Sequence, residues 1–145
     1  MSDQRQRLPE LAPAECMTLL GTVPFGRIVF TARALPAVRL ASHLVEDGRV
    51  IVRAGSDAAI ITPGMAAAGT VVAYQADVID PARSLGWSVT VVGMAHPVTA
   101  PDIAAAFRQG LSDLADGGDD QVIAIDVGMV TGFRLAAGDP AAAHG

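Results

Sequence analysis

The chain contains no lysine and no asparagine, so all ten of its basic residues are arginines. The lack of lysine excludes a Walker-type phosphate loop, a lysine Schiff base and a lysine general base. The single cysteine, Cys16, excludes an internal disulfide and is interpreted as a small buried hydrophobic residue rather than a reactive thiol. The three histidines lie on separate segments without the spacing of metal ligands, so a structural zinc site is not expected.

Positive charge is scarce as well, because the formal net charge is -5. An acidic chain lacks the attraction to phosphate backbones on which nucleic-acid binding depends, so no nucleic-acid partner is expected. No apolar run approaches the roughly 20 residues that cross a bilayer, and the polar start Met1–Arg7 is followed by no apolar stretch. We therefore expect no membrane span, no secretory signal and a cytoplasmic location.

A small acidic cluster lies in the second half of the chain, at Asp113, Asp116, Asp119 and Asp120. Glycines are interspersed among these aspartates, and their spacing does not fit the twelve-residue loop that binds calcium. The cluster is therefore interpreted as a solvated turn.

Short strands joined by tight turns dominate the local patterns. Apolar and β-branched runs predict strands at residues 26–31, 37–45, 49–53, 69–76, 86–98, 121–126 and 129–135. Amphipathic spacing and capping signals predict helices at residues 12–20, 56–68 and 101–114. This order lacks the strand–helix alternation of a parallel sheet, so we expect a mainly β fold, an antiparallel β-barrel with peripheral helices.

The length of 145 residues suits one domain with one core. We expect that domain at residues 11–136, between a flexible N-terminus at 1–10 and a flexible C-terminus at 137–145.

Turn signals divide the predicted strands. Glu46-Asp47-Gly48 predicts a tight hairpin, because Asp-Gly between β-forming residues suits the backbone of such turns. Further interruptions are predicted as a break at Ala34-Leu35-Pro36, a polar connection at 77–85, a bulge or corner at Gly93 and a last hairpin around Val127-Gly128.

Several predicted strands are apolar on both faces, as in Val50-Ile51-Val52 and Val89-Thr90-Val91-Val92. In an antiparallel sheet this pattern indicates that the outer face is covered as well as the inner one. We therefore expect a homodimer that packs on the outer face of the barrel.

The order and spacing of several segments resemble the pyridoxamine 5'-phosphate oxidase-like family over most of residues 11–135. The resemblance rests on these segments: Phe25-Gly26-Arg27-Ile28-Val29-Phe30, Leu35-Pro36-Ala37-Val38, Glu46-Asp47-Gly48, Arg53-Ala54-Gly55, and Gly86-Trp87-Ser88-Val89 with Gly93 and Ala95. It implies an antiparallel split β-barrel of the FMN-binding-protein type that forms dimers. It further implies flavin mononucleotide (FMN), or a deazaflavin coenzyme in some branches, held in clefts between the two subunits.

In such a protein the isoalloxazine ring carries the redox chemistry, so the protein supplies phosphate donors, hydrogen bonds to the ring and an apolar wall. The resemblance implies cofactor-binding residues as follows: Arg53 and Ser56 toward the phosphate, Ser42 and His43 along the ring, and Trp87 and Ser88 from the second subunit. Gln75 and Ser88 are candidate donors to ring oxygens. Arg53 suits phosphate because a guanidinium binds it bidentately and keeps its charge.

Each candidate also has a structural interpretation. Arg53 can pair with a carboxylate at the strand end, and His43 can be a strand histidine hydrogen-bonded to its surroundings. Trp87 can be a core or interface aromatic, while Gln75 and Ser88 can satisfy polar groups of the barrel itself.

The chain departs from the family pattern near the expected phosphate. Relatives commonly carry a lysine where this chain has Ala58-Ala59-Ile60, and Asp57 places a carboxylate at a predicted helix N-terminus that would otherwise favour an anion. Two hypotheses follow. The chain is a flavin- or deazaflavin-dependent oxidoreductase, or it is a non-catalytic split-barrel protein that binds another small ligand and has lost tight flavin binding, with no cofactor.

Overall fold

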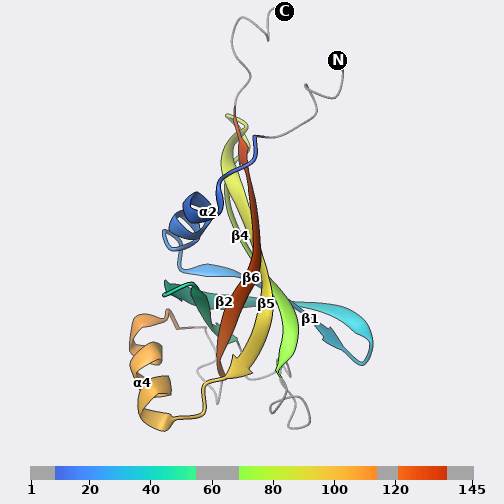
Figure 1. Ribbon diagram of the computed structural model, residues 1–145. Helices are drawn as coiled ribbons and strands as arrows, with labels where there is room; N and C mark the ends of the chain where they lie inside the picture. Colours follow the sequence, from blue (N-terminus) through green and yellow to red (C-terminus); the bar gives the residue numbers. More distant parts are fainter. Residues whose placement is uncertain (1–8, 55–68, 114–120, 137–145) are drawn as a thin grey trace, which may run out of the picture.

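The computed structural model describes residues 9–54, 69–113 and 121–136, whose six strands close into an antiparallel barrel (Figure 1). The strands are β1 (Phe25–Ala32), β2 (Leu35–Glu46), β3 (Arg49–Ala54), β4 (Thr70–Asp80), β5 (Leu85–Pro97) and β6 (Val122–Leu135). Around the ring the order is β1-β2-β3-β6-β5-β4. The predicted fold class, a mainly β antiparallel barrel with peripheral helices, is confirmed.

The core lies inside this ring, where alternate side chains of each strand point inward. On β1, Ile28 and Phe30 are buried, and on β5, Trp87, Val89 and Val91 are buried, while the residues between them are more exposed. The predicted Asp-Gly hairpin is confirmed, because Glu46 pairs with Arg49 on either side of a two-residue turn.

The predicted break at Ala34-Leu35-Pro36 is wrong, because β2 already begins at Leu35. The chain reverses instead at Arg33 and Ala34, both of which have positive φ, and Pro36 pairs with Thr31 inside the ribbon. Proline is tolerated there because β3 pairs only with residues 41–46 of β2, so the first half of β2 is an edge.

The predicted last hairpin around Val127-Gly128 is also wrong, because β6 runs without interruption from Val122 to Leu135. Val92 pairs with Met129 and Gly93 pairs with Val127, so Gly128 is the extra residue of a bulge. The bulge expected at Gly93 is thus confirmed in place. The polar connection predicted at 77–85 is shorter than expected, since β4 continues to Asp80 and β5 starts at Leu85.

Gly93 permits a close approach between β5 and β6, and replacing it should destabilise the barrel. A Cβ at this position would collide with the carbonyl oxygen of Asp126, which belongs to the paired strand. We expect Gly93→Ala to lower the free energy of unfolding in urea by about 3 kcal/mol. Gly48→Ala is the control, because a Cβ there has open space and only its φ of +73° is unfavourable, at about 1 kcal/mol. Equal losses in both variants would contradict the close approach.

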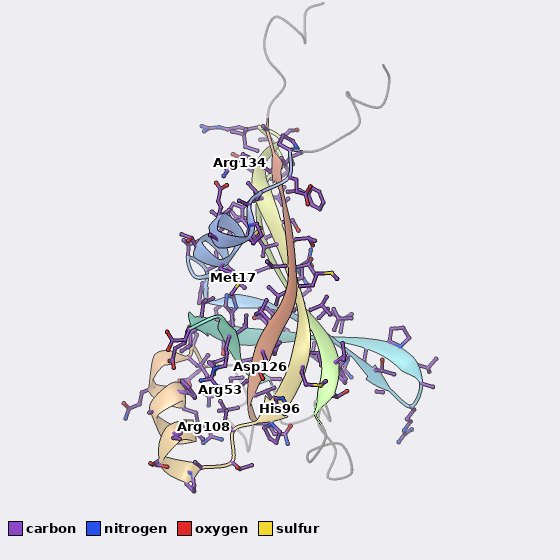
Figure 2. All side chains as sticks on the ribbon, in the orientation of Figure 1. Met17, Arg53, His96, Arg108, Asp126 and Arg134 are labelled. Carbon is purple, nitrogen blue, oxygen red and sulfur yellow. The ribbon has the colours of Figure 1, made fainter. Side chains whose placement is uncertain are left out.

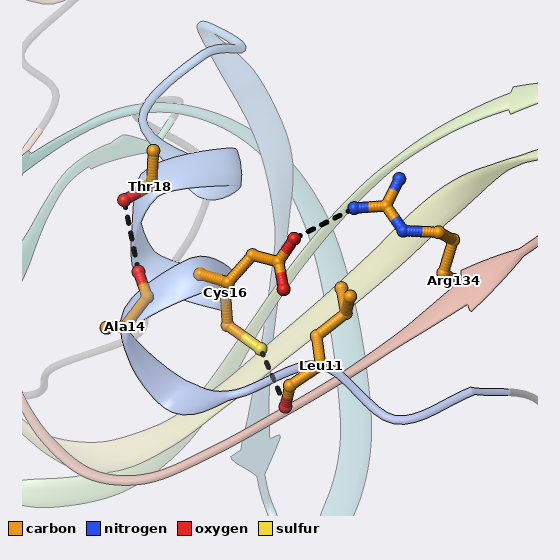
Figure 3. Close-up of polar contacts among 6 residues, drawn as sticks. Leu11, Ala14, Cys16, Thr18 and Arg134 are labelled. Atoms are coloured by element: carbon orange, nitrogen blue, oxygen red, sulfur yellow. Dashed lines mark hydrogen bonds and ion pairs between the residues drawn. The ribbon is translucent and has the colours of Figure 1, made fainter.

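The helix α2 (Pro13–Leu20) packs against β5 and β6 and buries Cys16 and Leu20. Arg134 Nη2 of β6 lies 3.0 Å from Glu15 Oε2, and the Cys16 thiol is 3.8 Å from the Leu11 carbonyl oxygen (Figure 3). Burial raises the pKa of Cys16. Its interpretation as a buried hydrophobic residue is therefore confirmed.

The helix α4 (Pro101–Gly110) lies beside the barrel, below α2 in the view of Figure 1. A second apolar cluster fastens it, in which Phe107 and Leu111 meet Ile51 and Val122 on the outside of β3 and β6. No helix within the described ranges is long and apolar enough to span a membrane. The helix predicted at 56–68, and with it the candidate Ser56, lies outside the described residues.

Candidate functional site

The candidate site begins with two neighbours on the outer side of β2 and β3. Ser42 of β2 pairs with Arg53 of β3, and paired residues carry their side chains on the same face of a sheet. The next residues along these strands, His43 and Val52, point into the barrel. Ser42 and Arg53 are nevertheless buried, although they face outward.

The Arg53 guanidinium, labelled in Figure 2, is held by a carboxylate that follows α4. Arg53 Nη1 lies 2.7 Å from Asp113 Oδ1, and the two side chains differ sharply in exposure, 10% for Arg53 and 86% for Asp113. The geometry is that of a charge-assisted hydrogen bond with one buried and one solvated partner. This matches the structural interpretation of Arg53, and it is compatible with anion binding because the exposed partner can leave.

Ser42 carries a buried hydroxyl, for which the described residues supply no hydrogen-bond partner. Native proteins pair nearly all such groups, and leaving one unpaired costs about 1–3 kcal/mol. A buried, unpartnered hydroxyl beside a buried guanidinium is an arrangement that an incoming oxygen ligand would complete. The sequence identified both residues as candidates, but it contained no signal that Asp113 would join them.

His43 lies on the other side of β2, in the core. Its Nε2 is 2.8 Å from the Leu20 carbonyl oxygen and its Nδ1 is 2.6 Å from the Tyr74 hydroxyl. A carbonyl only accepts, so Nε2 donates to Leu20, and in the neutral ring Nδ1 accepts from Tyr74. The Ala41 carbonyl oxygen, 3.3 Å from the Tyr74 hydroxyl, is a second and more distant acceptor for the same proton. Burial lowers the pKa of His43, although the Leu20 bond opposes this, and burial also raises the pKa of Tyr74.

His43 therefore has the role of a hydrogen-bonded strand histidine that ties the end of α2 to β4. Tyr74 was not among the residues predicted from the sequence, although it is the only tyrosine of the chain and interrupts an apolar strand. A place for His43 along a cofactor ring stays a prediction. Its side chain points away from the outer face on which Ser42 lies.

The buried His43 should make stability depend on pH. Its folded-state pKa lies below the unfolded value of about 6.5, so the unfolded chain binds more protons as pH falls through that value. We expect the free energy of unfolding to be fully retained above about pH 7 and to fall by up to about 1.4 kcal/mol by about pH 5.5. His43→Gln, whose amide can still donate to Leu20 and accept from Tyr74, should lose this part of the slope. The free energy of unfolding is measured by urea titration at several pH values. The same pH dependence in both proteins would show that His43 does not cause it.

Gln75 and Ser88 meet on the outer face of β4 and β5. Gln75 Nε2 donates to Ser88 Oγ at 3.1 Å, and Arg27 of β1 pairs with Gln75 from the other side. Trp87 points the opposite way into the core and is 8% exposed. The structure thus brings Gln75 and Ser88 together and leaves Trp87 apart from both.

A shallow hollow over β1 lies between two pairs of residues, Ser42 with Arg53 and Gln75 with Ser88. It has a volume of about 140 Å³ and is lined by Phe25, Gly26, Arg27, Leu40, Ala76 and Asp77. Pockets that hold small organic ligands measure about 300–1,000 Å³, so this hollow does not by itself enclose a molecule the size of a flavin. Within the described part of one chain, Ser42 and Arg53 stay separate from Gln75 and Ser88.

The closed antiparallel ring with two peripheral helices among the described residues makes this a split β-barrel protein. Residues 12–134 match the family model described as pyridoxamine 5'-phosphate oxidase, and the chain therefore belongs to the pyridoxamine 5'-phosphate oxidase-like family.

The chain is also similar to one protein in sequence and to solved structures in fold. The uncharacterized protein Rv0080 of Mycobacterium tuberculosis is 45% identical over 130 residues, which cover 88% of this chain and 86% of that protein. A solved structure of an FAD binding protein from Mycobacterium smegmatis is 26% identical, with a TM-score of 0.64, and covers 90% of this chain and 99% of its own. An FAD-binding protein from Mesorhizobium loti, 16% identical, has the same fold with a TM-score of 0.64 over 90% of this chain and 98% of its own.

Proposed function

We propose that the chain binds a flavin nucleotide through its phosphate, at Arg53 and Ser42 on the outer side of β2 and β3. The observation that carries this proposal is the buried Ser42 hydroxyl, unpartnered among the described residues, beside the buried Arg53 guanidinium. The binding of FAD by the relatives from Mycobacterium smegmatis and Mesorhizobium loti supports a flavin as the ligand. FMN is the flavin we propose, with a deazaflavin coenzyme as the alternative.

The residues present fit a phosphate group. The Arg53 guanidinium can bind two phosphate oxygens in parallel, and the Ser42 hydroxyl can donate to a third. Both groups are buried, so their contacts with an anion are screened less than contacts on an exposed surface. Ser56 stays a proposed contact of the same phosphate.

A bound flavin would supply the redox chemistry, and the chain would supply position and enclosure. Phe25 pairs with Ser42 on the outer face, and Leu40 lies two residues before Ser42 on the same side. These partly exposed apolar side chains are suited to cover a flat ring and to exclude water from it. On this basis we propose an oxidoreductase role for the protein.

A second copy of the chain would complete the site. Cross-strand pairing aligns one row of apolar side chains over five neighbouring strands, and we call it the outer apolar row: Val38, Val29, Ala73, Val92 and Met129. At its two ends Val38 is 50% and Met129 is 62% exposed. Contiguous exposed apolar surface of this kind is typical of protein interfaces. It supports a homodimer in which the outer apolar rows of two copies meet.

Gln75 lies immediately beside this row, two residues after Ala73 on the same face of β4. In a two-fold contact each copy presents the same surface to the other, so polar groups beside the row face the partner. We therefore propose that Gln75 and Ser88 of one copy donate to the flavin ring held at Ser42 and Arg53 of the other. Trp87 stays a prediction for this second half of the site.

The Arg53–Asp113 contact favours a second candidate function. A guanidinium that is already neutralised attracts an anion less, which fits a split-barrel protein that binds flavin weakly or binds another small ligand.

Titration of the purified chain with FMN, FAD and a deazaflavin coenzyme, followed by absorbance and flavin fluorescence, separates the two candidates. We expect a saturable spectral change with FMN or the deazaflavin coenzyme. No spectral change with any of the three would exclude flavin binding and favour the second candidate.

A further inference from the structure

Asp113 stands out among the charged groups around the barrel, because its carboxylate is almost fully exposed and yet lies 2.7 Å from a buried guanidinium. Burying an arginine without a counter-charge is unfavourable, so Arg53 gains from this contact. Asp113 gains less, because an exposed carboxylate is well solvated in either position. The contact therefore stabilises the buried Arg53 more than Asp113, so Asp113 can leave it at little cost to itself.

The packing of α4 explains why Asp113 reaches Arg53. Leu111, which directly follows α4, is buried against Ile51 and Val122 in the second apolar cluster. Val122 is the β6 partner of Arg53, and Leu111 has an extended backbone with φ -91° and ψ 142°. An extended chain that leaves this anchor brings the residue two positions later over the outer face of β3. The contact is thus built by the core and is not a chance meeting of two flexible side chains.

We propose that Asp113 is a built-in counter-ion that occupies Arg53 until the cofactor phosphate replaces it, and that it sets the affinity of the site for phosphate. This inference rests on the proposed function. An anion with one charge merely exchanges one charge-assisted hydrogen bond for another, so it gains little at this site. A phosphate monoester has close to two charges and three acceptor oxygens, so it can take both Arg53 and the Ser42 hydroxyl and displace the carboxylate.

The consequence is a selective site. Ligands without a phosphate group meet an arginine that is already neutralised, while FMN makes enough contacts to displace Asp113 from it. Asp113 would therefore weaken FMN binding and at the same time keep common monoanions out. Its removal should raise the affinity for FMN and leave the affinity for riboflavin, which lacks the phosphate, unchanged.

The test compares Asp113→Asn with Asp102→Asn, measuring the dissociation constants of FMN and riboflavin by fluorescence at fixed ionic strength. Asp102 is an exposed carboxylate in the first turn of α4, at the end of the helix remote from Asp113, so both variants change the net charge equally. We expect Asp113→Asn to bind FMN about three- to tenfold more tightly than the native chain, and Asp102→Asn to bind it as the native chain does. Riboflavin should bind equally to all three proteins.

Two results would overturn the inference while flavin binding itself stands. The first is an unchanged FMN affinity in Asp113→Asn, and the second is an equal gain for riboflavin, which would show an effect of shape instead of charge. If neither ligand binds to any of the three proteins, the proposed function fails and the inference fails with it. Asp113 is 86% exposed, and the amide oxygen of asparagine can still accept a hydrogen bond from Arg53, so the variant should fold. A single cooperative thermal transition verifies this.

Discussion

Met129→Glu should prevent formation of the proposed homodimer. Met129 ends the outer apolar row and is 62% exposed in one chain, so a homodimer built on this row would bury it twice, once in each copy. Burying an unpaired carboxylate costs several kcal/mol, and we expect the dissociation constant of the dimer to rise about a hundredfold or more. Light scattering after size exclusion should give twice the 14.8 kDa of one chain for the native protein and a single chain for the variant.

The matched control for this substitution is Gln109→Glu, which adds the same charge on an exposed position of α4. It should stay dimeric. Dissociation of the dimer into monomers should also weaken FMN binding, because Gln75 and Ser88 are proposed to come from the second copy. A native chain that is monomeric at micromolar concentration would contradict the proposed interface.

Arg53→Gln should weaken FMN binding about ten- to a hundredfold, because a charge-assisted contact to phosphate is worth about 1.5–3 kcal/mol. Glutamine keeps much of the length and can still donate to Asp113, so the barrel should remain folded. Arg83→Gln is the control, since Arg83 is exposed on the turn between β4 and β5 and pairs with Asp80. Calorimetric titration gives both dissociation constants. An unchanged constant for Arg53→Gln would exclude Arg53 from the phosphate site.

Local patterns were sufficient to predict the class of fold. The turn at Asp47 and Gly48 is encoded by those two residues, and the alternation of β1 and β5 follows directly from which side chains are apolar. The long β6 was predicted as a hairpin because the local pattern at Gly128 is typical of a turn. The structure uses it as a bulge opposite Val92 and Gly93, a role defined only by the neighbouring strand.

The candidate site residues could be proposed from the sequence, but their contacts could not. Ser42 and Arg53 were identified through the family resemblance, and strand pairing then placed them side by side. Their partners lie far away along the chain: Asp113 is 60 residues from Arg53, and Tyr74 is 31 residues from His43. No local pattern encodes such pairs, because closure of the barrel creates them.

The same limit applies to His43 and Trp87, whose side chains point into the core in one chain, while their roles along the cofactor stay predictions. Each lies next in sequence to an outward-facing residue, Ser42 or Ser88, and successive residues of a strand point to opposite faces. Two adjacent strand residues therefore cannot both face one site, and only the structure shows which of the two does so.

The proposal that the cofactor phosphate lies against Arg53 can be tested by a four-way comparison of dissociation constants. FMN and riboflavin are each titrated into the native chain and into Arg53→Gln. The substitution should weaken the binding of FMN about ten- to a hundredfold and leave the binding of riboflavin unchanged, since only FMN carries the phosphate. Equal losses for the two ligands would contradict the claim, because Arg53 would then act on the ring or on the fold and not on the phosphate.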